Sequence, residues 1–287
     1  MGIRMTAAPT EVPEAALGPR GYSLPLSPSG ESSMLTPPPW HFAGHILMVE
    51  YQVDPAAAIA FLPPELSLGS DPMVAAVFAE WQWCSKDGLE LADPQRCQFN
   101  EFMVLIRCEF EGTVLARCAY AWVDRAVPMV RGWLQGMPKQ FGSIQQTRPM
   151  PVGRAGGRLA KGGRFDGAVS VYGRRILEGS VTLQERVDAP PLLHKVPLVH
   201  TRLFPPWVDG EKPVSQLVVS DVEGVEFSDI WAGQASVRLF DDLGPGLADL
   251  YALAPTEVGR GYLFSYAETL CGGRLLNTTD LRLTGPQ

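Results

Sequence analysis

The chain has 287 residues, 46% of them hydrophobic and 19% charged, which is enough to build the core of one large domain or two small ones. Its 31 Asp and Glu outnumber its 24 Lys and Arg, and this acidic balance argues against a nucleic-acid partner. No apolar run approaches the roughly 18 residues of a membrane span, and the first residues lack the apolar centre of a signal peptide, so we expect a cytoplasmic protein with no membrane partner.

The first elements follow from turn residues and apolar periodicity. Residues 1–39 are rich in Pro, Ser and Gly and show no apolar period, so we predict a disordered leader there and a single domain at 40–287. A strand is expected at 45–53 (HILMVEYQV). A short helix should follow at 56–63, with Asp54 as its N-cap and a Pro-Pro pair at its end.

The remaining pattern is mostly that of strands. Residues 99–110 and 113–123 flank Glu111-Gly112, a pair typical of a tight hairpin turn. A helix is expected from Asp124, as its N-cap, to Leu134, with Gly136 ending it. Further strands are expected at 73–83, 167–173, 180–187, 214–227 and 228–240, and a short helix at 248–255. Without β-α-β repeats or GxGxxG, a doubly wound fold is excluded, and we predict an α+β protein of mainly antiparallel strands.

Several kinds of site find no support in the sequence. The four histidines (His41, His45, His194 and His200) form no HExxH motif, so we predict no metal site, and GxSxG is missing as well. Five cysteines without CxxC spacing indicate reduced thiols, and Cys108 and Cys118 lie in apolar strands typical of buried, unreactive thiols. The glycine-rich segment 154–167 lacks GKS or GKT and favours a flexible hairpin over a phosphate loop.

Residues 136–142 (GMPKQFG) offer a more specific chemistry. One proline and two glycines restrict the backbone around Lys139, and Met137, Phe141 and Trp133 are apolar neighbours. Burial in such a pocket disfavours the ammonium form of a lysine, and a neutral amine can attack a ketone to form a Schiff base. Most lysines in turns are solvated, so this pattern alone is a weak signal.

In this context, four segments resemble the acetoacetate decarboxylase family, and together the resemblance extends from about Trp40 to Leu270. Residues 41–66 resemble its first strand and short helix, and 97–112 (CQFNEFMVLIRCEFEG) the strand with its active-site glutamate. Residues 120–144 (YAWVDRAVPMVRGWLQGMPKQFGSI) resemble the segment with its Schiff-base lysine, and residues 229–250 resemble a segment near its C-terminus.

The resemblance implies a β-barrel or cone with a few short helices, a homo-oligomer, no cofactor and a small-molecule keto substrate. It also implies that Lys139 is the Schiff-base nucleophile and Glu101 its acid/base partner, and it matches Arg131 to an arginine of the lysine segment. The candidate substrate-binding residues are Arg131, His45, Gln140, Trp133, Glu80 and Met137.

Three departures from the family distinguish this chain. Gln140 stands where the decarboxylases have a second lysine. The first strand has Gly44 and His45 near the place of an arginine suited to a substrate carboxylate. Val77 stands about where the family has another glutamate, with Glu80 three residues further on. These departures favour a substrate other than acetoacetate. The tryptophans at 81, 83, 122 and 133 either line a larger apolar pocket or belong to the core.

A protonated imine on Lys139 accepts the electrons that decarboxylation releases, and it also acidifies the adjacent C–H bond, with Glu101 moving protons. We therefore predict a Schiff-base lyase of a specialised biosynthetic pathway, acting on a keto acid or a bulky ketone. Decarboxylation and an aldolase, dehydratase or cyclase reaction remain open. A non-catalytic scaffold that binds a ketone is an alternative of another class. A lipocalin-like carrier fits the strand count but does not explain residues 136–142.

Overall fold

The computed structural model describes residues 18–241, 244 and 246–278. The chain separates into two compact units, Met1–Pro37 and Pro38–Gln287. In the first unit the backbones of Arg20 and Ser27 pair, and the Ser33 hydroxyl donates a hydrogen bond of 2.8 Å to the carbonyl of Ser23. The predicted leader lies in part outside the described residues, and its disorder stays a prediction.

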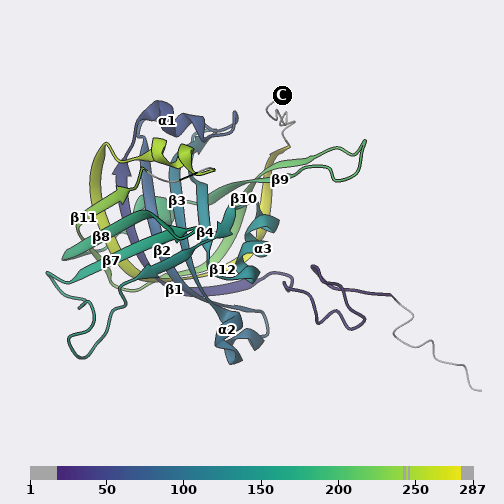
Figure 1. The fold of residues 1–287 in the computed structure, drawn as a ribbon, viewed down its shortest axis with the longest axis horizontal. Coiled ribbons are helices and arrows are strands. Elements are labelled where there is room, and N and C mark those ends of the chain that lie inside the picture. Colours follow the sequence, from purple (N-terminus) through teal and green to yellow (C-terminus); the bar gives the residue numbers. More distant parts are fainter. Residues whose placement is uncertain (1–17, 242–243, 245, 279–287) are drawn as a thin grey trace, which may run out of the picture. The chain divides into compact units, whose positions relative to one another are not determined.

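The second unit consists mainly of strands, with a few short helices (Figure 1). The strands are β1 (Trp40–Gln52), β2 (Met73–Ser85), β3 (Gln98–Phe110), β4 (Thr113–Val123), β5 (Lys139–Phe141), β6 (Ser143–Gln146), β7 (Arg164–Val171), β8 (Arg174–Val187), β9 (Leu198–Phe204), β10 (Val214–Phe227), β11 (Ile230–Leu239) and β12 (Glu257–Thr278). The helices are α1 (Pro55–Ala60), α2 (Pro94–Cys97), α3 (Ala126–Gln135) and α4 (Leu192–Lys195), with 3₁₀ turns η2 (Leu89–Ala92) and η3 (Ala248–Leu253). Within the described ranges, none of the helices is long and apolar enough to cross a membrane. The predicted α+β class with mainly antiparallel strands is confirmed.

Strand pairing closes part of the sheet into a ring. Neighbouring strands follow the order β1-β2-β3-β4-β9-β10-β12, and β12 pairs in addition with β1, from Trp40 opposite Leu270 to Gln52 opposite Glu257. The pairs of β4 with β5 and of β4 with β9 are parallel, whereas the other strand pairs are antiparallel. From β12 the sheet continues through β11, β8, β7 and β6, which form a second layer.

Alternation along the strands separates two hydrophobic cores. Side chains of successive strand residues point to opposite faces. Ile46 and Met48 of β1 therefore pack in a cluster enclosed by the ring, whereas Leu47 and Val49 pack in a cluster shared with β7, β8 and β11. A functional side chain on these strands thus faces the ring interior or the second layer according to its position in the alternation.

Local capping explains how the helices begin and end. The Asp54 carboxylate accepts from the backbone N–H groups of two α1 residues, as predicted, although α1 ends before the predicted limit at 63. The prediction that Asp124 caps α3 is wrong. Arg125 occupies the N-cap, and the Asp124 carboxylate accepts hydrogen bonds from the backbone and the side chain of Asn100. Gly136 ends α3 with a φ of 93°, as predicted.

Candidate active site

The lysine of the GMPKQFG segment lies in β5, beside β4. Gly136 ends α3, and after two further residues Lys139 pairs in parallel register with Ala121. Its side chain lies against α3 at Gly132, which has no side chain to obstruct it. The indole of Trp133 donates a hydrogen bond of 2.7 Å to the carbonyl of Lys139, which fixes the backbone at this point. The lysine is only 4% exposed.

Lys139 forms a buried ion pair with Glu101 of β3. The distance between Nζ of Lys139 and Oε1 of Glu101 is 2.8 Å, and the two side chains are 4% and 6% exposed. The other oxygen of the carboxylate, Oε2, accepts a hydrogen bond of 2.9 Å from Nε1 of Trp81. Two buried charges are tolerated here because each has a charged or hydrogen-bonding partner.

The ion pair faces a cavity of about 680 Å³ inside the ring. Its walls come from β1, β2, β3, β5, β9, β10 and β12 and from helices α3 and α4. This volume lies within the range of roughly 300–1,000 Å³ typical of small-molecule sites. Met137, two residues before Lys139, is part of the lining. The cavity therefore has room for a ligand larger than a three-carbon acid.

Arg131 of α3 supplies a buried cation to the cavity in addition to Lys139. Its side chain is 1% exposed, and the guanidinium carbon lies 4.5 Å from the ring centre of Trp83 and 4.6 Å from that of Phe42. Burial lowers the pKa of Arg131 to about 9, although Glu101 and Glu90 act in the opposite direction. Among the described residues Nη1 and Nη2 have no hydrogen-bond partner. A buried guanidinium with two such donors is well suited to a carboxylate ligand.

Glu268, a further carboxyl group of the cavity, was not found by the sequence analysis. Glu268 of β12 accepts a hydrogen bond of 2.7 Å from the hydroxyl of Tyr266. Burial raises the pKa of Glu268 and the nearby Glu101 raises it further, while the bond from Tyr266 and the charge of Lys139 oppose the shift. In the sequence, Glu268 and Glu101 show the same pattern. Each is a carboxylate among the inward-facing, apolar residues of a long strand.

Two uncharged histidines also belong to the polar lining. The ring of His194 lies with its centre 4.3 Å from that of Tyr266, and burial lowers the pKa of His194 to about 4. Nε2 of His200 lies 3.2 Å from the Ser220 hydroxyl, and burial, assisted by Arg117 and Lys139, lowers the pKa of His200 to about 3. At neutral pH both imidazoles are therefore polar but neutral.

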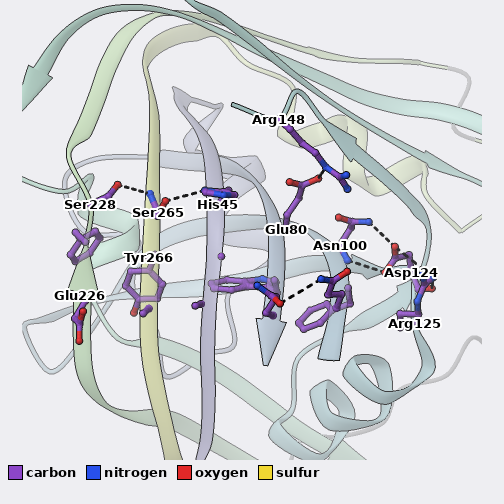
Figure 2. Close-up of a pocket in the computed structure, with 18 residues that line it drawn as sticks. His45, Glu80, Asn100, Asp124, Arg125, Arg148, Glu226, Ser228, Ser265 and Tyr266 are labelled. Atoms are coloured by element: carbon purple, nitrogen blue, oxygen red, sulfur yellow. Dashed lines mark hydrogen bonds and ion pairs between the residues drawn. The ribbon is translucent and has the colours of Figure 1, made fainter. Parts of the chain in front are cut away.

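Two predicted site residues line a different pocket. His45 and Glu80 face the outer side of the ring wall, in a pocket of about 670 Å³. Figure 2 shows His45 turned toward Ser265, at 3.0 Å, and Glu80 turned toward Arg148, at 2.8 Å. Neither residue is part of the lining of the Lys139 cavity. Their predicted role in substrate binding is therefore not supported by their position.

The other predicted residues can now be placed. Arg131 and Met137 share the cavity with Lys139 and Glu101. Gln140 follows Lys139 in β5, opposite Trp122, and lies outside the lining, as does Trp133, which is 53% exposed. Within the part of the chain that the structure describes, no three His, Cys, Asp or Glu side chains are arranged to hold a metal ion.

The chain combines a ring of strands with a buried lysine–glutamate ion pair. The acetoacetate decarboxylase (ADC) family matches residues 23–279, so the chain belongs to this family, as its sequence predicted. The chain is therefore an enzyme of the acetoacetate decarboxylase-like type.

Solved structures of related enzymes cover most of the chain. The enduracididine biosynthesis enzyme MppR, in complex with the condensation product of pyruvate and imidazole 4-carboxaldehyde, is 64% identical over 90% of this chain and 97% of its own, with a TM-score of 0.87. MppR complexed with pyruvate is 63% identical over 91% and 99%, with a TM-score of 0.86. An acetoacetate decarboxylase-like enzyme from Sphingomonas wittichii RW1 is 27% identical over 91% and 100%, with a TM-score of 0.82. The comparison with curated proteins gave no match.

Proposed function

We propose that this enzyme forms an imine between Lys139 and a 2-oxo acid of the pyruvate type, and that it uses the imine to condense this acid with an aldehyde. The observation that carries the proposal is the buried contact of 2.8 Å between Lys139 and Glu101 in a cavity that also holds Arg131. The high identity to MppR, which has been seen with pyruvate and with a pyruvate-derived condensation product, supports this substrate class.

Arg131 would bind the carboxylate of the 2-oxo acid. Its two nitrogens without a partner among the described residues match the two oxygens of a carboxylate, and the surrounding aromatic rings exclude water that would weaken the ion pair. The carboxylate and the keto group of a 2-oxo acid are adjacent, so anchoring one places the other. Arg131 thereby directs the keto carbon toward Lys139, because its neighbour Gly132 contacts the lysine side chain.

Imine formation begins with proton transfer from the Lys139 ammonium to Glu101. The neutral amine then adds to the keto carbon, and the keto oxygen leaves as water after it has received two protons. The resulting protonated imine withdraws electrons from the neighbouring carbon. One of its C–H protons passes to a cavity carboxylate, Glu101 or Glu268, and an enamine forms.

The enamine carbon then attacks the carbonyl carbon of the aldehyde, which forms the new C–C bond. The aldehyde oxygen takes a proton from a carboxyl group and becomes a hydroxyl. Loss of a second proton from the nucleophilic carbon and departure of the hydroxyl as water give the unsaturated product, still bound as an imine. Water hydrolyses this imine and restores Lys139. Two carboxyl groups, Glu101 and Glu268, suit a sequence with several proton transfers.

Decarboxylation of a 3-oxo acid through the same imine is the second candidate. Membership of the acetoacetate decarboxylase family favours it. Release of carbon dioxide distinguishes the two reactions, because the condensation releases only water. The relationship to an enzyme of enduracididine biosynthesis supports a role in a specialised biosynthetic pathway. A homo-oligomer remains a prediction.

The proposal is tested by trapping the imine. Borohydride reduction in the presence of pyruvate should attach the acid permanently to Lys139 as a secondary amine, which peptide mass spectrometry locates. Lys139→Ala should remain folded and trap nothing, whereas Lys161→Ala, in the glycine-rich loop, should trap as wild type does. In a separate reaction without borohydride, pyruvate and imidazole 4-carboxaldehyde together should give a conjugated product with a new ultraviolet absorption. Absence of a wild-type adduct, or an adduct in Lys139→Ala, overturns the proposal.

A further inference from the structure

A glycine in the ring wall separates two aromatic rings that contact each other. Gly44 of β1 lies opposite Tyr266 of β12 on one side and opposite Trp81 of β2 on the other. Because Gly44 has no side chain, the two rings meet across it, with centroids 6.2 Å apart and an interplanar angle of 70°. This edge-to-face arrangement is one that aromatic pairs prefer.

Each of these rings holds one carboxyl group of the Lys139 cavity. Nε1 of Trp81 donates 2.9 Å to Oε2 of Glu101, and the hydroxyl of Tyr266 donates 2.7 Å to Oε2 of Glu268. Both rings and both carboxyl groups line the Lys139 cavity. The orientation of the two acids therefore depends on rings that are in contact only because the position between them is a glycine. Figure 2 shows Tyr266 beside β1, on the strand that also carries Ser265.

Space, not backbone conformation, explains the glycine. A Cβ on Gly44 would lie 2.6 Å from Cε3 and 3.2 Å from Cδ2 of Trp81, and 2.5 Å from the carbonyl oxygen of Glu80. Relief of the contact with the Glu80 carbonyl needs a small shift of the paired strands β1 and β2, whereas the Trp81 ring can also turn by itself. Phe42 also packs against the Trp81 ring, at 6.0 Å, and restricts where it can go.

We propose that Gly44 is a positioning residue, which keeps the Trp81 indole N–H on Glu101 by leaving room for the Trp81–Tyr266 contact. The inference rests on the proposed function, since it assigns proton transfer to Glu101. Charged or titratable groups that face Glu101 are Lys139 from β5, Arg131 from α3, Glu268 from β12 and Cys118 from β4. The indole bond holds one carboxylate oxygen of Glu101, and the other oxygen is left for Lys139.

The test compares Gly44→Ala, Trp81→Phe and the double variant. Loss of the indole bond should lower kcat by about tenfold, which corresponds to about 1.4 kcal/mol, the order expected for one hydrogen bond to a charged group. Both single variants should show this loss with little change in KM, because neither substitution removes the Arg131 guanidinium. The double variant should show no further loss of kcat, because both changes remove the same bond.

The matched control is Gly167→Ala, in which a Cβ would lie 2.7 Å from the ring of Phe78 in the other core. It should lower Tm without changing kcat. A folded Gly44→Ala with the wild-type kcat, or additive losses of kcat in the double variant, overturns the proposal. If Gly44→Ala does not fold, Trp81→Phe decides, because it removes the same hydrogen bond without adding a Cβ: a lower kcat supports the proposal, and a wild-type kcat overturns it. Wild-type imine trapping with pyruvate, measured in parallel, shows separately whether the proposed function holds.

Discussion

Gly132 of α3 lies directly against the side chain of Lys139. A Cβ at position 132 would come within 2.3 Å of Cδ, 2.6 Å of Cγ and 2.9 Å of Cε of the lysine. Real Cβ atoms do not approach other atoms so closely, because interiors are already close-packed. The path of the Lys139 side chain to Glu101 therefore requires a glycine on the facing turn of α3.

Gly132→Ala should consequently displace Lys139 from Glu101. We expect imine trapping with pyruvate to fall at least about tenfold, which corresponds to about 1.4 kcal/mol. Alanine favours a helix by about 1 kcal/mol over glycine, so the loss would not reflect a weaker helix. The matched control is the same change in a Lys139→Ala background, where the methyl group meets no lysine and should raise Tm. Wild-type trapping in Gly132→Ala would contradict this account.

Glu101→Gln should slow turnover by about 10²- to 10⁴-fold, the usual contribution of general acid–base catalysis. The amide cannot accept the proton of Lys139, but its oxygen can still accept the Trp81 N–H bond, so the side chain should stay in place. Trapping of the pyruvate imine should persist, only more slowly. Stopped-flow measurement of the condensation separates the two effects. An unchanged rate would mean that Glu101 is only a structural counter-ion.

Strand alternation explains which predicted residues share the site. Trp81 and Glu101 point into the ring, so Glu80, one position from Trp81, must point outward, and the same holds for His45 beside Gly44. A separation of three, such as that from Val77 to Glu80, always changes face in a regular strand. Alternation alone therefore excludes Glu80 from a site that faces the same side of β2 as Val77 and Trp81.

Turns have a local signal in the sequence, whereas the closure of the ring has none. Glycines, which adopt positive φ readily, indicated the turn at Glu111-Gly112 and the end of α3 at Gly136. Closure of the ring depends on pairs such as Trp40 with Leu270, whose separation leaves no periodic pattern. The same long-range pairing brings Glu268 to the cavity. The family resemblance identified Lys139 and Glu101, but only the structure places Glu268 and Tyr266 beside them.

Arg131→Lys should weaken pyruvate binding even though it keeps a positive charge. The guanidinium is planar, lies among four aromatic rings and offers two donors to one carboxylate, whereas an ammonium is a compact and strongly hydrated charge. We expect KM for pyruvate to rise by about tenfold or more, equivalent to about 1.4 kcal/mol, with a smaller effect on kcat. Arg125→Lys, at an exposed position outside the cavity, is the matched control. Equal KM values for Arg131→Lys and wild type would remove Arg131 from the binding site.

The two histidines of the cavity predict acid sensitivity of the fold. His194 and His200 have pKa values of about 4 and about 3 in the folded protein, against about 6.5 in an unfolded chain. Below pH 6.5 the unfolded chain binds more protons, so the free energy of unfolding falls as pH drops toward 4. Each histidine contributes a slope of about 1.4 kcal/mol per pH unit in this window.

His200→Asn should flatten that slope by the contribution of one histidine. Urea unfolding at several pH values measures it, and taking the difference from wild type cancels the opposing effect of Glu268, whose pKa is raised by burial. His45→Asn, at an exposed position, should leave the slope as in wild type. If His200→Asn and wild type lose stability in parallel below pH 6.5, the buried imidazole is not the cause.

Acetoacetate should be a poor substrate despite the family to which this enzyme belongs. In this cavity the carboxylate would meet Arg131, a buried cation without other hydrogen-bond partners among the described residues. A methylene group also separates the carboxylate of acetoacetate from its keto carbon, so anchoring the carboxylate places this carbonyl differently from that of pyruvate. We expect kcat/KM for carbon dioxide release below about 10⁴ M⁻¹s⁻¹, the low end of ordinary enzymes, with faster turnover of pyruvate and an aromatic aldehyde.

Release of carbon dioxide can be followed directly, with Lys139→Ala as the blank. A value above that limit would mean that Arg131 does not hold the carboxylate in the reacting complex, and that decarboxylation is the reaction for which this cavity is built.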